Sequence, residues 1–204
     1  MIGIIDYGLG NVEAFRVAYK RLGKASRRVK TPEDVADVTH IILPGVGAFD
    51  SAMERFNASG LWPALKNALE NRALPLLGVC VGMQMLADRS DEGDLPGLGL
   101  ISGNIRLFAQ GQHGRMLRCP HMGWNEVDVT SDTPLLSGLE EHRKFYFLHS
   151  YYFEPADPDT QLAQTLYGSP FSCAVGKGSV HGVQFHPEKS HEAGLILLNN
   201  FSEL

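Results

Sequence analysis

Three short apolar runs mark the first half of the chain, and each of them ends at a turn. They are IGIID (2–6), HIILPG (40–45) and LPLLGV (74–79). Continuous apolar runs of this length, bounded by turn residues, are typical of strands that are buried on both faces. The pattern therefore predicts three central strands of a parallel sheet.

Between these runs, the apolar positions follow the spacing of a helix. Residues 11–22 give the clearest case, with Asn11 in the N-cap position and Gly23 directly after the end. Further helices are expected over residues 48–57, 61–72, 82–88 and 190–201. Strands that alternate with helices indicate an α/β protein whose mainly parallel sheet has helices on both faces.

The pattern changes after about residue 95, where short β-rich segments alternate with turn signals. These segments predict additional strands in the C-terminal half, some of them antiparallel. The sequence shows no internal repeat, low-complexity tract or linker. We therefore expect residues 1–204 to form one domain.

Composition and charge narrow the classes of function. The net charge of −5 disfavours a broad surface for nucleic acid, and no apolar run approaches the ~18 residues of a membrane span. The N-terminus lacks the basic and apolar regions of a signal peptide. Three scattered cysteines (Cys80, Cys119 and Cys173) do not resemble a disulfide framework. These features predict a cytoplasmic protein.

Cys80 lies between two glycines directly after the third apolar run, in the stretch LGVCVGMQ (77–84). This layout is typical of a nucleophile elbow, a sharp turn at which side chains beside the nucleophile would clash. The start of the following helix would favour the thiolate, the reactive form of cysteine. The alternative is a buried structural cysteine at the end of a strand.

A thiolate nucleophile needs an acid–base partner, and His186 stands out among the 8 histidines. It ends a predicted strand, and Glu188 follows two positions later, on the same side of an extended backbone. Pro187 restricts His186 to extended conformations. The pattern predicts a Cys-His-Glu triad, although a loop histidine and an exposed carboxylate would explain each residue taken alone.

The segment LPGVGAF (43–49) ends the second apolar run and predicts an oxyanion-binding turn. Its two glycines, Gly45 and Gly47, let the backbone approach a ligand and turn a peptide N–H toward a developing negative charge. We expect donors from Val46 and Gly47, and from Val81, the residue after the nucleophile. The alternative is a glycine-rich turn without a ligand.

Two other patterns fit a ligand site poorly. Gly8 and Gly10 follow the first apolar run, but Glu13 stands where a dinucleotide fingerprint needs a third glycine. His186 and Glu188, taken with His191, have an irregular spacing for zinc. We therefore expect no metal and no cofactor.

Taken together, these motifs resemble the class I glutamine amidotransferases, which use a Cys-His-Glu triad. The segments GVCVGMQ and VQFHPEKS carry this resemblance. The segments IIDYGLGN, ILPGVGAF, PHMGWN and FLHSYY are similar to one subfamily, the glutaminase subunits of imidazole glycerol phosphate synthases. The matches run in order from residue 4 to residue 190. The resemblance implies the flavodoxin-like three-layer fold of the family.

The resemblance also implies a reaction. Cys80 would attack the side-chain amide carbon of glutamine, His186 would move protons, and Glu188 would hold His186 in place. Ammonia would leave first, and water would then release glutamate from a thioester. The residues implied to bind glutamine are Gly47, Gln84, Glu92, His149, Ser150 and Tyr151.

In this subfamily the ammonia passes to a (β/α)8-barrel cyclase subunit. The resemblance therefore implies a heterodimer that serves histidine biosynthesis, and very weak glutaminase activity for the isolated chain. The residues expected to face the partner are His121, Met122, Gly123, Trp124, Asn125 and Lys189.

Two alternatives remain open at this point. A paralogous subunit that supplies ammonia for amidation of a surface-polysaccharide sugar would share these motifs. Separately, Val81 stands where the family usually has leucine, a conservative change. The second alternative is a non-catalytic binding module on the same fold, but such a module should have lost at least one of Cys80, His186 and Glu188.

Overall fold

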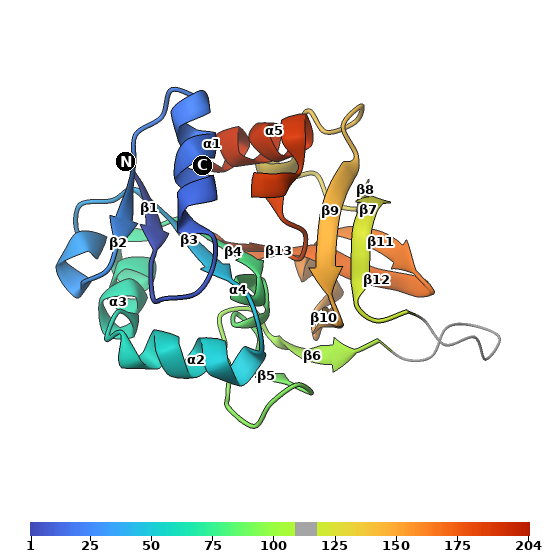
Figure 1. Cartoon of the computed structure of the whole chain (residues 1–204), viewed down its shortest axis with the longest axis horizontal. Coiled ribbons are helices and arrows are strands. Elements are labelled where there is room, and N and C mark those ends of the chain that lie inside the picture. The colour runs from blue at the N-terminus through green and yellow to red at the C-terminus, as the bar shows by residue number, and fades with distance from the viewer. Residues whose placement is uncertain (109–117) are drawn as a thin grey trace.

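The structure is a computed structural model that describes residues 1–108 and 118–204. Within these ranges, a mixed sheet of 11 strands crosses the molecule in the order β2-β1-β3-β4-β13-β12-β10-β6-β5, with β11 and β8 attached beyond β12. Figure 1 shows α1 and α5 above this sheet and α2 and α3 below it. The helices are α1 (Val12–Arg21), α2 (Phe49–Ala58), α3 (Trp62–Arg72), α4 (Val81–Gln84) and α5 (His191–Phe201).

One half of the sheet is parallel. It consists of β1 (Ile2–Ile5), β2 (Ser26–Val29), β3 (His40–Gly45), β4 (Leu76–Cys80) and β13 (Val180–Val183). Every residue of β1 and of β4 is buried, as expected for strands that are covered on both faces. The apolar runs therefore identified three of these strands correctly.

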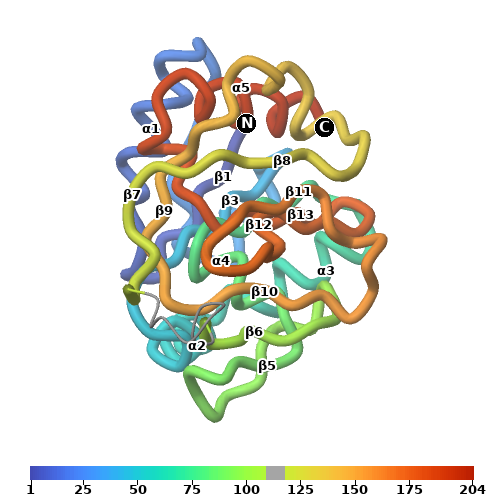
Figure 2. The backbone as a smooth tube through the Cα atoms, turned by 90° about the vertical axis from the view of Figure 1, so that its right-hand side faces the viewer, coloured from blue at the N-terminus to red at the C-terminus, as the bar shows by residue number. Residues whose placement is uncertain are grey.

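The other half is mainly antiparallel, and this confirms the predicted division of the fold. Its strands are β5 (Arg89–Ser90), β6 (Gly103–Leu107), β8 (Asp128–Val129), β10 (Tyr151–Pro155), β11 (Gln161–Tyr167) and β12 (Ser169–Lys177). A separate ribbon pairs β7 (His121–Glu126) with β9 (Lys144–His149) and runs along one margin of the molecule (Figure 2). The described ranges also contain four short 3-10 helices: η1 (Pro32–Val35), η3 (Pro134–Leu136), η4 (Pro158–Thr160) and η5 (Pro187–Lys189).

The ends of α1 are formed as the sequence predicts. The Asn11 side chain accepts a hydrogen bond from the Ala14 amide at 3.1 Å, so it caps the first turn. Gly23 has a φ of +69° directly after the helix, a conformation that glycine adopts without strain. Because Phe15 and Tyr19 are fully buried, this helix is anchored to the core along one face.

The helix predicted over residues 82–88 is wrong in length. The helix α4 ends at Gln84. The next two amides reach back only three residues, from Leu86 N to Met83 O at 3.0 Å and from Ala87 N to Gln84 O at 3.1 Å, and Asp88 N donates to Gly103 O at 2.9 Å. Met85 O accepts from Leu98 N at 2.7 Å, and Leu86 O accepts from Leu100 N at 2.9 Å. Tertiary hydrogen bonds therefore end this helix, and no local signal marks its end.

The chain carries three free thiols, at Cys80, Cys119 and Cys173. In the part of the chain that the structure describes, no helix combines the length and the apolar character needed to cross a membrane.

Candidate active site

The candidate site lies where three neighbouring parallel strands end. β4 pairs with β3 on one side and with β13 on the other, and Gly45 at the end of β3 lies opposite Cys80 at the end of β4. His186 follows β13 by three positions. In open α/β sheets, ligands bind at the carboxyl ends of the strands. The topology thus brings together motifs that are far apart in the sequence.

Cys80 forms a strained turn between β4 and α4. Its φ of +56° is unusual for a residue with a side chain, and this agrees with the predicted elbow. The flanking glycines are required by crowding: a Cβ on Gly78 would approach Gly82 O to 2.5 Å, and a Cβ on Gly82 would approach Leu43 O to 1.9 Å. Cys80 is therefore held with its thiol at the end of the sheet, with only 4% of the residue exposed.

His186 and Glu188 form the pair that the sequence predicts. His186 Nδ1 lies 2.9 Å from Glu188 Oε1, and both side chains are almost completely buried. Glu188 belongs to η5 and not to an extended segment, so a tight turn brings the two side chains together. The hydrogen bond assigns the proton to Nδ1 and leaves Nε2 to exchange a proton with a neighbour.

The surroundings of His186 favour its charged form. Burial alone would lower the pKa of His186, but hydrogen bonds and charge interactions with Cys80 and Glu188 raise it above the usual value. An imidazolium beside a thiolate is the state that arms a cysteine nucleophile.

The predicted oxyanion turn lies beside Cys80. Gly47 has a φ of +88°, and a Cβ added there would contact nothing within 4 Å, so the left-handed backbone alone explains this glycine. By contrast, a Cβ on Gly45 would approach Gly82 N to 2.5 Å. Val46 is 41% exposed.

A cavity of about 250 Å³ opens beside the Cys80 thiol. Its volume lies slightly below the range of drug-sized ligand sites, so it suits a small metabolite. It brings together Cys80, His186, all three predicted oxyanion residues and all six predicted glutamine-binding residues. The full lining is Val46, Gly47, Cys80, Val81, Gln84, Glu92, Pro120, Leu148, His149, Ser150, Tyr151, His186 and Lys189.

Two of the lining residues are fixed by hydrogen bonds to the protein. Glu92 Oε2 accepts from Phe49 N at 2.9 Å, at the start of α2, and partial burial raises the pKa of this carboxyl. Gln84 Nε2 donates to Tyr151 O at 3.2 Å and to Gln184 Oε1 at 3.1 Å.

Gln184 also contacts Cys80, although it is not among the site residues that the sequence predicts. Its Nε2 lies 3.8 Å from Cys80 Sγ, and the residue is completely buried. Gln184 precedes His186 by two positions, so the alternation of an extended backbone could have indicated that both side chains face the site.

The residues expected to face a partner differ in exposure along β7. Met122 is 66% exposed and Trp124 is 49% exposed, whereas His121 is 4% exposed and packs between Phe147 and Tyr167. Gly123 and Asn125 are half-buried, and Lys189 lines the cavity, with its Nζ 5.6 Å from the centre of the Tyr146 ring.

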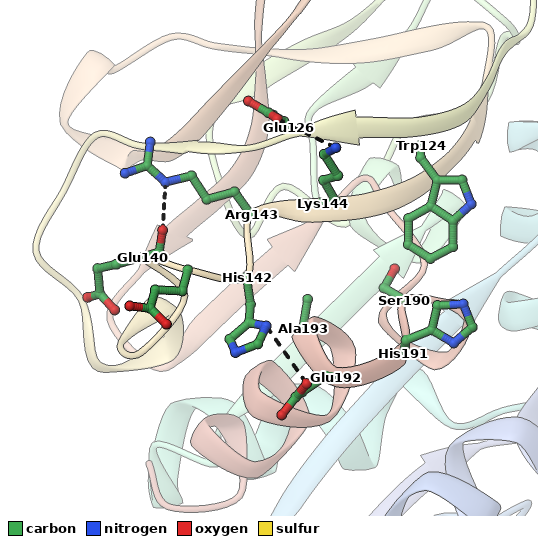
Figure 3. A pocket seen from close by; sticks show the side chains of 11 residues that line it. Trp124, Glu126, Glu140, His142, Arg143, Lys144, Ser190, His191, Glu192 and Ala193 are labelled. Atoms are coloured by element: carbon green, nitrogen blue, oxygen red, sulfur yellow. Dashed lines mark hydrogen bonds and ion pairs between the residues drawn. The ribbon is translucent and has the colours of Figure 1, made fainter.

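A larger hollow of about 570 Å³ lies away from Cys80, between the β7–β9 ribbon and the start of α5 (Figure 3). Two close pairs lie in its lining: His142 Nδ1 is 4.0 Å from Glu192 Oε2, and Lys144 Nζ is 3.9 Å from Glu126 Oε1. Trp124 stacks on His191 at its edge. Its lining contains none of Cys80, His186 and Glu188, so size alone does not make this hollow the active site.

Comparisons with known proteins agree with this geometry. The model of the family "Glutamine amidotransferase class-I" matches residues 4–203. The chain is 52% identical to "Imidazole glycerol phosphate synthase subunit HisH" of Bdellovibrio bacteriovorus and 46% identical to the protein of that name from Leptospira interrogans. Both alignments cover 100% of this chain and 100% of the relative.

The fold is also similar to that of solved structures. PurLQS from Thermotoga maritima aligns with a TM-score of 0.74 over 99% of this chain and 97% of that chain, at 21% identity. A solved glutamine amidotransferase aligns with a TM-score of 0.73 over 98% of each chain, also at 21% identity. At this level of identity, these likenesses concern the fold alone.

Proposed function

Because the chain belongs to the class I glutamine amidotransferases, we propose that it is the glutaminase subunit of an imidazole glycerol phosphate synthase. It hydrolyses glutamine to glutamate and delivers the ammonia to a synthase partner. The observation that carries the proposal is the strained Cys80 elbow beside the buried His186–Glu188 pair.

The reaction proceeds in two halves. The first half starts from the ion pair in which the Cys80 proton already lies on His186, and the thiolate Sγ attacks the side-chain amide carbon of glutamine. The peptide N–H of Val81 and one from the Val46–Gly47 segment stabilise the oxyanion. His186 then protonates the leaving nitrogen, ammonia departs, and a glutamyl thioester remains.

In the second half, His186 takes a proton from water, and the resulting hydroxide attacks the thioester. The carbon–sulfur bond breaks, glutamate leaves, and Cys80 returns to its resting state. Glu188 keeps the proton of His186 on Nδ1 throughout and stabilises the imidazolium that forms in each half. The relatives of this chain are named as synthase subunits, which supports a partner that uses the ammonia.

We assign the partner as a (β/α)8-barrel cyclase in a heterodimer for histidine biosynthesis. The exposed apolar side chains of Met122 and Trp124 on β7 support a protein contact at this ribbon, and Lys189 lines the cavity. Residues 1–204 act as one domain in the cytoplasm, and the reaction needs neither metal nor cofactor.

The test uses this chain together with a cyclase subunit. Cys80→Ala should abolish synthesis from glutamine but leave synthesis from free ammonia intact, because the cyclase does not need the thiol. Cys119→Ser is the matched control, since Cys119 is exposed and should be dispensable. A chloro-ketone analogue of glutamine should label the wild type at Cys80. Equal loss of both activities in Cys80→Ala, or no labelling of Cys80 in the complex, would contradict the proposal.

A further inference from the structure

A series of hydrogen bonds, which we call the relay, runs from Asn125 through His121 and His149 to the Tyr151 carbonyl at the cavity. His121 and His149 lie directly opposite each other in the ribbon, and His121 Nδ1 lies 3.0 Å from His149 Nε2. His149 Nδ1 lies 2.7 Å from Tyr151 O, and Asn125 Nδ2 lies 3.3 Å from His121 Nε2. The proposed reaction uses neither imidazole.

The hydrogen-bonding partners in this relay determine which nitrogen of each imidazole carries a proton. A carbonyl oxygen only accepts, so His149 Nδ1 carries a hydrogen and donates to Tyr151 O. In a neutral ring, His149 Nε2 then accepts from His121 Nδ1–H, and His121 Nε2 accepts from Asn125 Nδ2–H. The Asn125 amide is itself oriented, because its Oδ1 accepts from Glu126 N and its Nδ2 also donates to Leu166 O.

The surroundings keep both rings neutral and fixed. Burial lowers the pKa of His121 to about 4 and that of His149 to about 3. The His121 ring stacks between Phe147 and Tyr167, with centroid distances of 4.8 and 4.1 Å. His149 packs against Phe108 and Phe171, each at 5.3 Å. Among the residues that the structure describes, no carboxylate pairs with either ring, so the neutral state of both imidazoles is the stable one.

The relay reaches the cavity through Gln84. Tyr151 O accepts from His149 and from Gln84 Nε2, and the second N–H of that amide donates to Gln184 Oε1. Both N–H groups of Gln84 are therefore used inside the protein. Its Oε1 is left as the hydrogen-bonding atom of that amide available to a ligand, and an acceptor suits the N–H groups of an amino-acid amide.

We propose that His149, supported by His121, is a positioning residue that fixes the Tyr151 carbonyl and so orients the Gln84 amide for substrate. This inference rests on the proposed glutaminase function. His149 lines the cavity, but both of its ring nitrogens are used within the protein, so it acts on the substrate through Gln84.

Two variants of His149 separate hydrogen bonding from packing. His149→Phe keeps an aromatic ring in the cluster but removes the donor to Tyr151 O. His149→Asn loses the ring but places an amide N–H near the position of Nδ1. In the complex with a cyclase, we expect His149→Phe to raise KM for glutamine about 10-fold, with kcat changed less than about threefold. His149→Asn should bring KM back to within about threefold of wild type. His121→Phe should raise KM less, since the bond to Tyr151 survives.

A purely structural role predicts the opposite order, in which His149→Asn is the worse variant because it leaves a cavity. That order, or a KM unchanged in His149→Phe, would overturn the proposal. A second readout needs no activity: long-range ¹H–¹⁵N spectra of the wild-type chain should show His149 neutral, with its proton on Nδ1. An imidazolium, or a proton on Nε2, would refute the relay even if glutamine hydrolysis were confirmed. Absence of glutaminase activity together with the expected tautomer would instead count against the proposed function alone.

Discussion

Two buried histidine environments lie a short distance apart in this protein and favour opposite charge states. His186 is 4% exposed, and the adjacent Cys80 and Glu188 raise its pKa. His121 is also 4% exposed and His149 is 6% exposed, but burial among aromatic rings lowers the pKa of both. Equal burial thus gives one histidine built to carry charge and two built to exclude it.

The difference lies in the neighbours of each ring. Hydrogen bonds and charge interactions with Cys80 and Glu188 offset the desolvation cost of the His186 imidazolium, whereas the His121–His149 pair has only neutral hydrogen-bonding partners. The charged histidine can exchange a proton during a reaction. The neutral pair can hold fixed donors and acceptors over the whole physiological pH range. Depth of burial alone therefore does not predict the role of a histidine.

Removing the negative charge of Glu188 beside His186 should have the largest effect on activity. Glu188→Gln keeps the shape of the side chain but no longer stabilises the imidazolium, so glutamine hydrolysis in the complex should fall about 10³-fold, or ~4 kcal/mol. The pKa of His186, followed by NMR titration, should fall toward the behaviour of the neutral pair. Glu192→Gln is the control, because that carboxylate is 75% exposed on α5. Activity within about 10-fold of wild type in Glu188→Gln would show that the charge of the pair is not needed.

The two environments should also give opposite pH dependences of stability. A histidine with a lowered pKa stabilises the fold above its unfolded value of 6.5, and this is lost as pH falls toward the folded value. For His121 the loss amounts to ~2 kcal/mol between about pH 7.5 and 5. The contribution of His186 has the opposite sign: it is complete below 6.5 and is lost as pH rises through the raised pKa.

Denaturant unfolding across this pH range tests the predicted sign of the His121 contribution to stability. His121→Phe cannot take up the extra proton when it unfolds, so its free energy of unfolding should decline less steeply between about pH 7.5 and 5 than that of the wild type. The stacked aromatic neighbours accept a phenyl ring, so the variant should fold. Parallel pH profiles of the two proteins would mean that His121 is not held neutral.

Gln184 joins the two environments, since its amide contacts both Cys80 Sγ and Gln84. Gln184→Met conserves approximate volume but removes the donor to the thiolate, so kcat should fall about 10-fold. KM should change little, because Tyr151 O still holds Gln84. Gln164→Met, on β11, is the matched control. The rate of Cys80 alkylation against pH gives an independent measure, and an unchanged profile would exclude this contact as a stabiliser of the thiolate.

The sequence predicts local constraints well. Gly78 and Gly82 crowd against a turn that lies within the same few residues, so the elbow follows from its own segment. Local sequence patterns do not show which distant residues come into contact: Gln184 contacts Cys80, although the two are 104 positions apart. His121 and His149 lie opposite each other because of the register of β7 with β9, which no local pattern determines. The motif PHMGWN therefore predicts His121 at an interface, whereas the structure buries it.

Tertiary contacts also explain where the predicted secondary structure differs from the observed one. The strand β2, with sequence SRRV, has only one buried residue and lacks the apolar run that identifies its neighbours. It is a strand because it pairs with β1 at the edge of the sheet. The overlong prediction after Cys80 has the same cause, since a distant loop supplies the hydrogen bonds that end α4.

The smallest effect is expected at the outer end of the relay. Asn125 is half-buried and its bond to His121 Nε2 is long, at 3.3 Å, so water can replace it in Asn125→Ala. Stability should change by ~0.5 kcal/mol and KM for glutamine by less than about twofold. Asn125→Asp is the informative companion, because a carboxylate accepts only and therefore demands a proton on Nε2. With Nδ1–H already donated to His149, His121 would have to become an imidazolium, and its pKa should rise. A titration in which Asn125→Asp leaves the pKa of His121 unchanged would show that the neutral state is set by the aromatic cluster alone.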